Sequence, residues 1–201
     1  MVAGGFEHGL EEADAHQWVQ DAITKYFEAE GDLLSHVAER SHTNRLTLHL
    51  DRALSERHTE LCRQGWKVDA EYNRVGATDT TKALPTLIAK LEQLALGMGW
   101  HPGRLLRDRS TTNVSPDFVL HRRQSGREVG NAVVCELKRR DEDVDDIAID
   151  VGKLLAFRSD LHYTHAFMIL LGGPDDTEVV SISDSMEAAL SFLRQLHDRG
   201  A

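Results

Sequence analysis

The sequence has little cysteine and no long apolar run. Cys62 and Cys135 are the only cysteines among 201 residues, too few for a disulfide framework. Cys135 lies in an apolar stretch, where a reduced, buried thiol is expected. No window approaches the roughly 18 to 20 continuous apolar residues of a membrane span, and the N-terminal residues lack the basic start and apolar core of a secretory signal. A cytoplasmic protein without a membrane partner is therefore expected.

Metal-binding patterns of the zinc type are missing as well. The chain has 11 histidines, but none forms a His-x-x-x-His pair, and the cysteines form no Cys-x-x-Cys pair. Internal repeats and low-complexity tracts are also absent. With 41% hydrophobic and 28% charged residues, a chain of this length suits one globular core. A single domain spanning residues 1–201 is therefore expected.

Hydrophobic periodicity divides the chain into helical and extended segments. Helical spacing is found in an N-terminal region 10–58, in an inserted segment 75–114, after residue 141 and after Asp184. Gly31 is expected to break the first stretch, residues 41–44 to cap the next helix, and Asp184 to cap the last. Extended segments are expected at 66–74, twice within 115–140, at 166–171 and at 179–182. This order predicts an α/β fold with a central mixed β-sheet flanked by helices.

The net charge of −10 argues at first sight against a nucleic-acid partner, because it repels phosphates. Between residues 101 and 140, however, nine basic and four acidic residues give a local charge of +5, so the remainder carries −15. The acidic run 141–150 is expected to be a solvated face that leads into a helix. The candidate nucleic-acid contacts are Arg74, Arg104, Arg107, Arg109, Arg122 and Arg139.

The most informative polar residues lie in the stretch 115–140. Asp117 opens the first strand, and Glu136 and Lys138 lie two apart near the end of the second. Alternate strand residues share a face, and a hairpin would bring Asp117 back beside the other two. The residues before Glu136 are apolar on both faces, which predicts a central strand, where charges need partners. Two carboxylates and a lysine at a strand end indicate a divalent-metal site for phosphodiester chemistry.

Each member of this group has a role that suits its chemistry. Asp117, Glu136 and the backbone carbonyl of Leu137 would supply the oxygen ligands that Mg²⁺ or Mn²⁺ prefers. Lys138, kept protonated by the neighbouring carboxylates, would orient a water molecule or stabilise developing negative charge. Lys153, on the following helix, would either reach the site or cover apolar surface with its stem.

Four sequence blocks, in this order, resemble the PD-(D/E)xK phosphodiesterase superfamily, and in particular a bacterial group of small members. The blocks are E-R-S-H-T-N-R-L from Glu39, V-D-A-E-Y-N-R from Val68, S-P-D-F-V-L-H-R-R from Ser115 and V-V-C-E-L-K-R from Val133. The resemblance implies a restriction-endonuclease-like core and an Mg²⁺-dependent nuclease or endonuclease acting on DNA rather than RNA. It also implies that an acid on the first core helix, here Glu39, completes the catalytic group.

Alternatives remain open for two acids and for the function itself. Glu39 is either a metal ligand or an acid favoured by the helix dipole, and Glu71 is either an additional ligand or a solvated residue. A nuclease fold without turnover would serve as a binding module. An acidic protein-interaction protein that binds no nucleic acid would account for the net charge. A homodimer is a further expectation for a nuclease, because cutting both strands of a duplex needs two sites.

Overall fold

Five strands form one mixed sheet. The computed structural model describes residues 10–31, 39–70, 84–106, 114–122 and 130–200, with the backbone alone at residues 39, 40 and 200. Neighbouring strands are antiparallel, except for β3 and β4, which are parallel. The predicted mixed sheet and the hairpin within 115–140 are confirmed. Across the sheet the strands follow chain order: β1 (Trp66–Ala70), β2 (Phe118–Arg122), β3 (Asn131–Arg139), β4 (His165–Leu171) and β5 (Glu178–Ser181).

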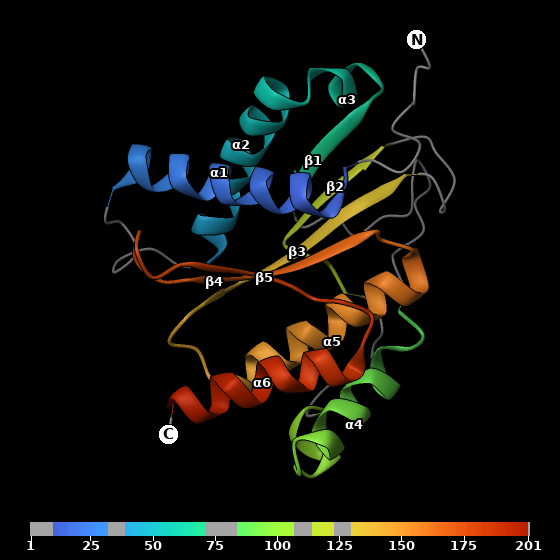
Figure 1. Cartoon of the computed structure of the whole chain (residues 1–201). Helices are drawn as coiled ribbons and strands as arrows, with labels where there is room; N and C mark the ends of the chain where they lie inside the picture. The colour runs from blue at the N-terminus through green and yellow to red at the C-terminus, as the bar shows by residue number, and fades with distance from the viewer. Residues whose placement is uncertain (1–9, 32–38, 71–83, 107–113, 123–129, 201) are drawn as a thin grey trace.

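Helices cover both faces of this sheet, as the α/β prediction requires (Figure 1). The first face carries α1 (Glu12–Glu30), α2 (Glu39–Arg57) and the short α3 (Thr59–Arg63). The second face carries α4 (Leu87–Gly97), the 3-10 turn η2 (Pro102–Arg104), α5 (Val144–Leu161) and α6 (Met186–Gly200). Parallel neighbours need a crossover connection, and α5 supplies it between β3 and β4.

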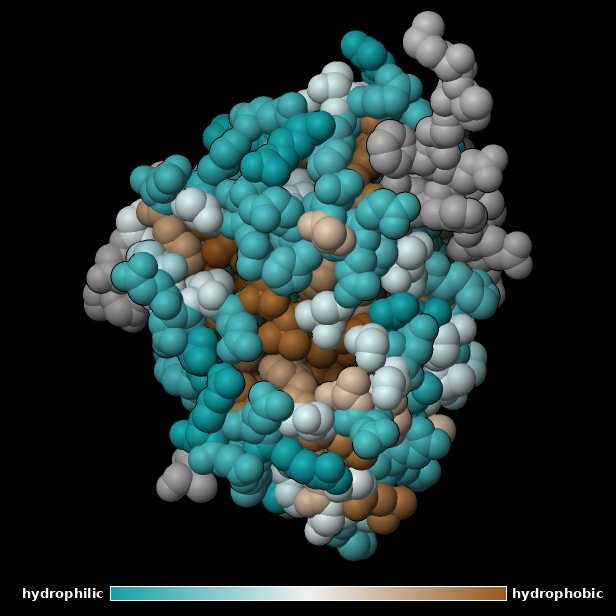
Figure 2. All heavy atoms as spheres, in the orientation of Figure 1, coloured by the Kyte–Doolittle hydropathy of each residue, from teal (hydrophilic) through white to brown (hydrophobic). Residues whose placement is uncertain are grey.

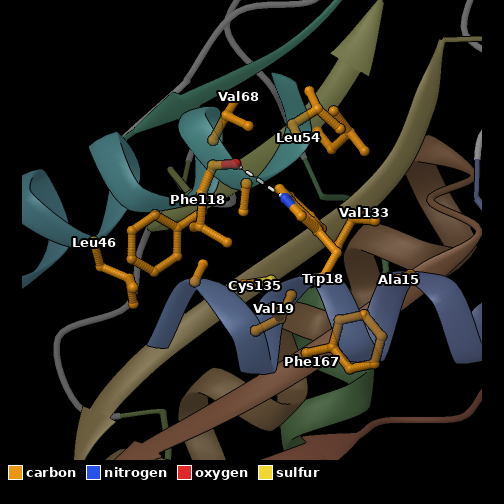
Figure 3. Packing of buried hydrophobic residues seen from close by; sticks show 14 of the residues in the cluster. Ala15, Trp18, Val19, Leu46, Leu54, Val68, Phe118, Val133, Cys135 and Phe167 are labelled. Atoms are coloured by element: carbon orange, nitrogen blue, oxygen red, sulfur yellow. Dashed lines mark hydrogen bonds between the residues drawn. The ribbon is translucent and has the colours of Figure 1, made fainter. Parts of the chain in front are cut away.

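Each face of the sheet has its own apolar core. Side chains alternate along β3, so Cys135 packs with α1 and α2, whereas Val134 packs with α4, α5 and α6. In the first core, the buried Trp18 of α1 donates a hydrogen bond from Nε1 to the carbonyl of Leu50 in α2 at 3.0 Å (Figure 3). The same alternation places Glu136 on the second face, beneath α5.

The edge strand β5 is less well covered than its neighbour β4. All residues of β4 are buried, which confirms the predicted central strand, whereas those of β5 are half-buried or exposed. Apolar side chains gather in the hollow between α1 and α6, and hydrophilic side chains surround them (Figure 2). Among the described helices, none combines the length and the apolar character needed to cross a bilayer.

Two predicted caps are wrong. Helix α2 begins at Glu39, before residues 41–44, because its buried face continues backward from Leu46 through the buried Thr43 and His42. At the last helix, the hydroxyl of Ser185 accepts the N–H of Ala188 at 3.3 Å. Asp184 instead forms an ion pair with Arg158 of α5 at 2.7 Å. The predicted break at Gly31 is confirmed: α1 ends there, and its φ of 60° is a conformation that glycine adopts readily.

Candidate functional site

The β2–β3 hairpin brings two acids together. The register pairs Phe118 with Cys135, so Asp117, which precedes β2, comes beside Glu136. Asp117 Oδ2 accepts a hydrogen bond of 2.7 Å from the backbone N–H of Leu137. The carboxyl groups of Asp117 and Glu136 are close enough for each to shift the pKa of the other. The hairpin therefore brings two acids that are 19 positions apart in the sequence together at one end of the sheet.

Burial makes it unfavourable for both acids to be charged. Glu136 is only 2% exposed. Burial raises the pKa of Asp117 to about 6, although the N–H of Leu137 acts in the opposite direction. Burial also raises the pKa of Glu136 well above its usual range, and the charges of Asp150 and Asp117 add to this effect while Lys153 opposes it. Two carboxyls in such contact favour a state in which they share a proton.

A buried aspartate on α5 connects two lysines to this pair. Asp150 is 2% exposed. Its Oδ2 lies 3.3 Å from Nζ of Lys138, and its Oδ1 lies 2.5 Å from Nζ of Lys153. Lys153 also approaches Oε1 of Glu136 at 3.7 Å. Burial lowers the pKa of Lys153, but the carboxylates of Glu136 and Asp150 raise it more, so this ammonium group stays charged at neutral pH.

The role of Asp150 was not predicted. Asp141, Asp143 and Asp146 are exposed as expected for a solvated acidic run, but the prediction is wrong for Asp150. A signal was present: Asp150 lies three residues after Ile147 and four before Leu154, on the apolar stripe of the helix. An acid on such a stripe needs a buried partner. Of the two alternatives for Lys153, the structure favours the one in which its ammonium group reaches the acids.

The donor atoms of this cluster suit a hard cation. Glu136 Oε1 and Asp150 Oδ2 are buried and lie within ion-pair distance of Lys153 and Lys138, but neither accepts a hydrogen bond of good geometry within the described ranges. Those same ranges contain no set of three or more His, Cys, Asp or Glu side chains arranged around one metal position. Mg²⁺, however, is commonly held by one or two carboxylates, with water and substrate phosphate filling the other positions. Asp117 and Glu136 fit that requirement for Mg²⁺ or Mn²⁺.

The backbone carbonyl of Leu137 points to the side of β3 on which Asp117 lies. The N–H and C=O of one strand residue point to the same neighbouring strand, and the N–H of Leu137 reaches Asp117. If the register of the hairpin is continued by two residues, Pro116 comes opposite Leu137. Proline has no N–H to donate. Pro116 therefore cannot donate a ladder hydrogen bond to the carbonyl of Leu137. This supports the carbonyl of Leu137 as a candidate metal ligand.

The remaining predicted ligands are not placed in the cluster. Helix α2 starts at Glu39, but the side chain of Glu39 lies outside the described residues, as does the whole of Glu71. The buried residues of α2 pack on the first face of the sheet with Leu137, opposite Glu136.

The described arginines interact with groups of the chain itself. Arg104 pairs with Asp145 at 2.6 Å and lies over the ring of Trp100. Arg139 pairs with Asp141 at 2.5 Å. Arg122 lies 5.7 Å from the ring centroid of Trp66. The other three candidate contacts lie outside the described residues: Arg74, Arg107 and Arg109.

The fold and site were also compared with known proteins. Neither protein-family models, nor curated proteins, nor solved structures give a match to this chain.

Proposed function

We propose that the protein is a metal-dependent nuclease of the PD-(D/E)xK type, with a restriction-endonuclease-like core, that hydrolyses phosphodiester bonds in DNA rather than RNA. One observation carries the proposal: the hairpin joins Asp117 to Glu136, and Lys138 lies two residues further along β3. Burial opposes the simultaneous charging of the two acids. A site that needs a positive charge between two acids is suited to a divalent cation.

The residues divide the chemistry between them. Asp117, Glu136 and the carbonyl of Leu137 would hold Mg²⁺ or Mn²⁺. When bound, such an ion polarises a phosphoryl oxygen and makes a water molecule more acidic. Lys138 presents an ammonium group 3.3 Å from Asp150 and would stabilise the negative charge that develops on the phosphate. Because it pairs with Asp150, Lys138 serves as a fixed positive charge rather than as a base.

The charge distribution affects substrate binding. Arg104 and Arg139 are already paired with Asp145 and Asp141, which limits the positive charge they offer to a phosphate. A nucleic acid has to compete with these carboxylates for the arginines. The competition is weak, because an exposed ion pair of this kind contributes only about 0 to 1 kcal/mol to stability. Binding should therefore weaken strongly as salt is added, since phosphate contacts depend on released counterions.

A cleavage assay with three substrates tests the proposal. Purified protein is incubated with supercoiled plasmid, single-stranded DNA or RNA, in Mg²⁺, Mn²⁺ or EDTA. Metal-dependent cleavage of DNA that disappears in Asp117→Ala and Lys138→Ala supports the nuclease. Lys67→Ala, which removes an exposed lysine from the neighbouring β1, should retain the activity. Binding without cleavage would support a nuclease fold without turnover, and neither binding nor cleavage would support an acidic interaction protein.

A further inference from the structure

We propose that Asp150 of α5 is a positioning residue of the site: its two carboxylate oxygens hold the ammonium groups of Lys138 and Lys153 on the side of the acid pair. This inference rests on the proposed function for its catalytic consequence. Its structural content, that Asp150 orders Lys138, can be measured without any cleavage.

Asp150 contacts both lysines. One oxygen lies 3.3 Å from Lys138 Nζ, and the other lies 2.5 Å from Lys153 Nζ. Lys138 and Lys153 come from different elements, β3 and α5, so a single carboxylate joins the strand of the site to the helix above it. A lysine side chain has four rotatable bonds and loses rotamer entropy when it is fixed. The ion pairs with Asp150 help to offset this loss for both lysines.

The position of Asp150 is itself fixed by packing. Its neighbours Ile147, Val151 and Leu154 on α5 are buried in the second core. The next turn is held closely by α4, because a Cβ added at Gly152 would lie 2.5 Å from Cδ2 of Leu91. Helix α5 therefore has little freedom to move over β3. A rigid element is a suitable support for a group that must orient a long, flexible side chain.

Three substitutions and one control distinguish a positioning role of Asp150 from a general effect of its negative charge. Asp150→Asn keeps the side-chain size and removes the charge, Asp150→Glu keeps the charge, and Lys153→Met leaves Asp150 and Lys138 in place. Asp146→Ala removes an exposed acid from the same helix and is the matched control. The first readout is nuclear magnetic resonance of ¹³C-labelled lysine in the metal-free protein, which reports the order of the Lys138 ε-methylene. The second is kcat and KM on a short DNA duplex with Mn²⁺.

The Lys138 ε-methylene should be ordered in the wild type, Lys153→Met and Asp146→Ala, and mobile in Asp150→Asn. Asp150→Glu should restore part of the order. A misplaced group typically costs up to about 100-fold in rate, so kcat should fall roughly 10- to 100-fold in Asp150→Asn with little change in KM. Unchanged order of Lys138 in Asp150→Asn, or an unchanged kcat in an active protein, overturns the inference. If Asp150→Asn does not fold, wild-type kcat and order in Asp150→Ala would overturn it in the same way.

The two proposals fail differently. If the wild type cleaves no substrate, the nuclease proposal is wrong, and the order of Lys138 alone decides whether Asp150 positions it. If the wild type cleaves and Asp150→Asn cleaves equally well, the nuclease proposal stands and the positioning role is wrong.

Discussion

At the scale of single residues, the site places charge where charge is unfavourable. Asp117 and Glu136 lie beside one another in a buried position, and burial raises the pKa of each. Lys138 and Lys153 supply positive charge, but Asp150 competes for both ammonium groups. A cation bound there, as proposed, would stabilise the charged forms of both acids. Sites of this kind commonly sacrifice stability for function.

Replacing Asp117 with asparagine should stabilise the metal-free protein at neutral pH. A folded-state pKa of about 6 means that the folded protein binds more protons than the unfolded chain between about pH 4 and pH 6. Stability from this group is therefore present below pH 4 and is lost as pH rises to 6. Asp117→Asn cannot ionise, so its advantage over the wild type should grow from near zero at pH 4 to roughly 2–3 kcal/mol at pH 7.5.

Urea unfolding in EDTA at both pH values measures this difference. Asp146→Asn, at an exposed position of α5, should show no pH-dependent difference from the wild type. A gap between Asp117→Asn and the wild type that is the same at pH 4 and pH 7.5 would contradict the buried-acid account.

The sequence was sufficient for part of this site. Asp117, Glu136 and Lys138 could be grouped because strand alternation and a hairpin connect them through local rules. Asp150 was missed because the run 141–150 contains many acids, and composition hides one member that faces inward. Which acid faces inward depends on how α5 packs on β3, which is a long-range property.

At the scale of elements, α5 supports the site from above. It follows β3 directly, crosses the second face of the sheet and leads into β4, and it carries both Asp150 and Lys153. Its buried residues were predictable from helical periodicity, and the strand 166–171 from its continuous apolar run. The caps of α2 and α6 were not, because several polar residues near each helix start compete for the same role. Tertiary contacts, such as the pair Asp184–Arg158, decide between them.

A bulky side chain at Gly152 should push α4 away from α5. The added atoms of Gly152→Val would meet Leu91, since even a Cβ lies 2.5 Å from its Cδ2. Overpacking of a core typically destabilises a protein by about 1–3 kcal/mol. Thermal and urea unfolding should show a loss of this size, whereas Gly173→Val, at a position with no atom within 4 Å of an added Cβ, should change stability little. Equal effects at the two positions would show that the α4–α5 contact is not close.

At the scale of the whole molecule, two apolar cores meet at one sheet, and the acid pair lies at the end of its central strands. Because β3 is buried on both faces, a change at Glu136 acts on the strand that joins the two cores. The net charge of −10 did not predict this arrangement, since it describes the surface as a whole. Binding of a cation at the site should therefore change the stability of the whole fold and not only that of the β2–β3 hairpin.

Mn²⁺ should stabilise the whole fold through Asp117. A ligand that binds only the folded state adds about 2.7 kcal/mol at a concentration of 100 times its Kd. Binding should also release protons at pH 6, because a cation favours the charged form of the acid pair. Thermal unfolding with increasing Mn²⁺, and calorimetry in two buffers of different ionisation enthalpy, measure both effects. Equal stabilisation of the wild type and Asp117→Asn would place the cation elsewhere.

The most direct test of the central claim is plasmid cleavage by the wild type and Asp117→Asn, side by side, in Mn²⁺ at pH 7.5. The account predicts that the wild type converts supercoiled plasmid into nicked or linear forms and that EDTA stops the reaction. It also predicts that Asp117→Asn, although at least as stable as the wild type without metal, leaves the plasmid supercoiled. Cleavage by Asp117→Asn at the wild-type rate, or no cleavage by the folded wild type, would contradict a nuclease site at Asp117 and Glu136.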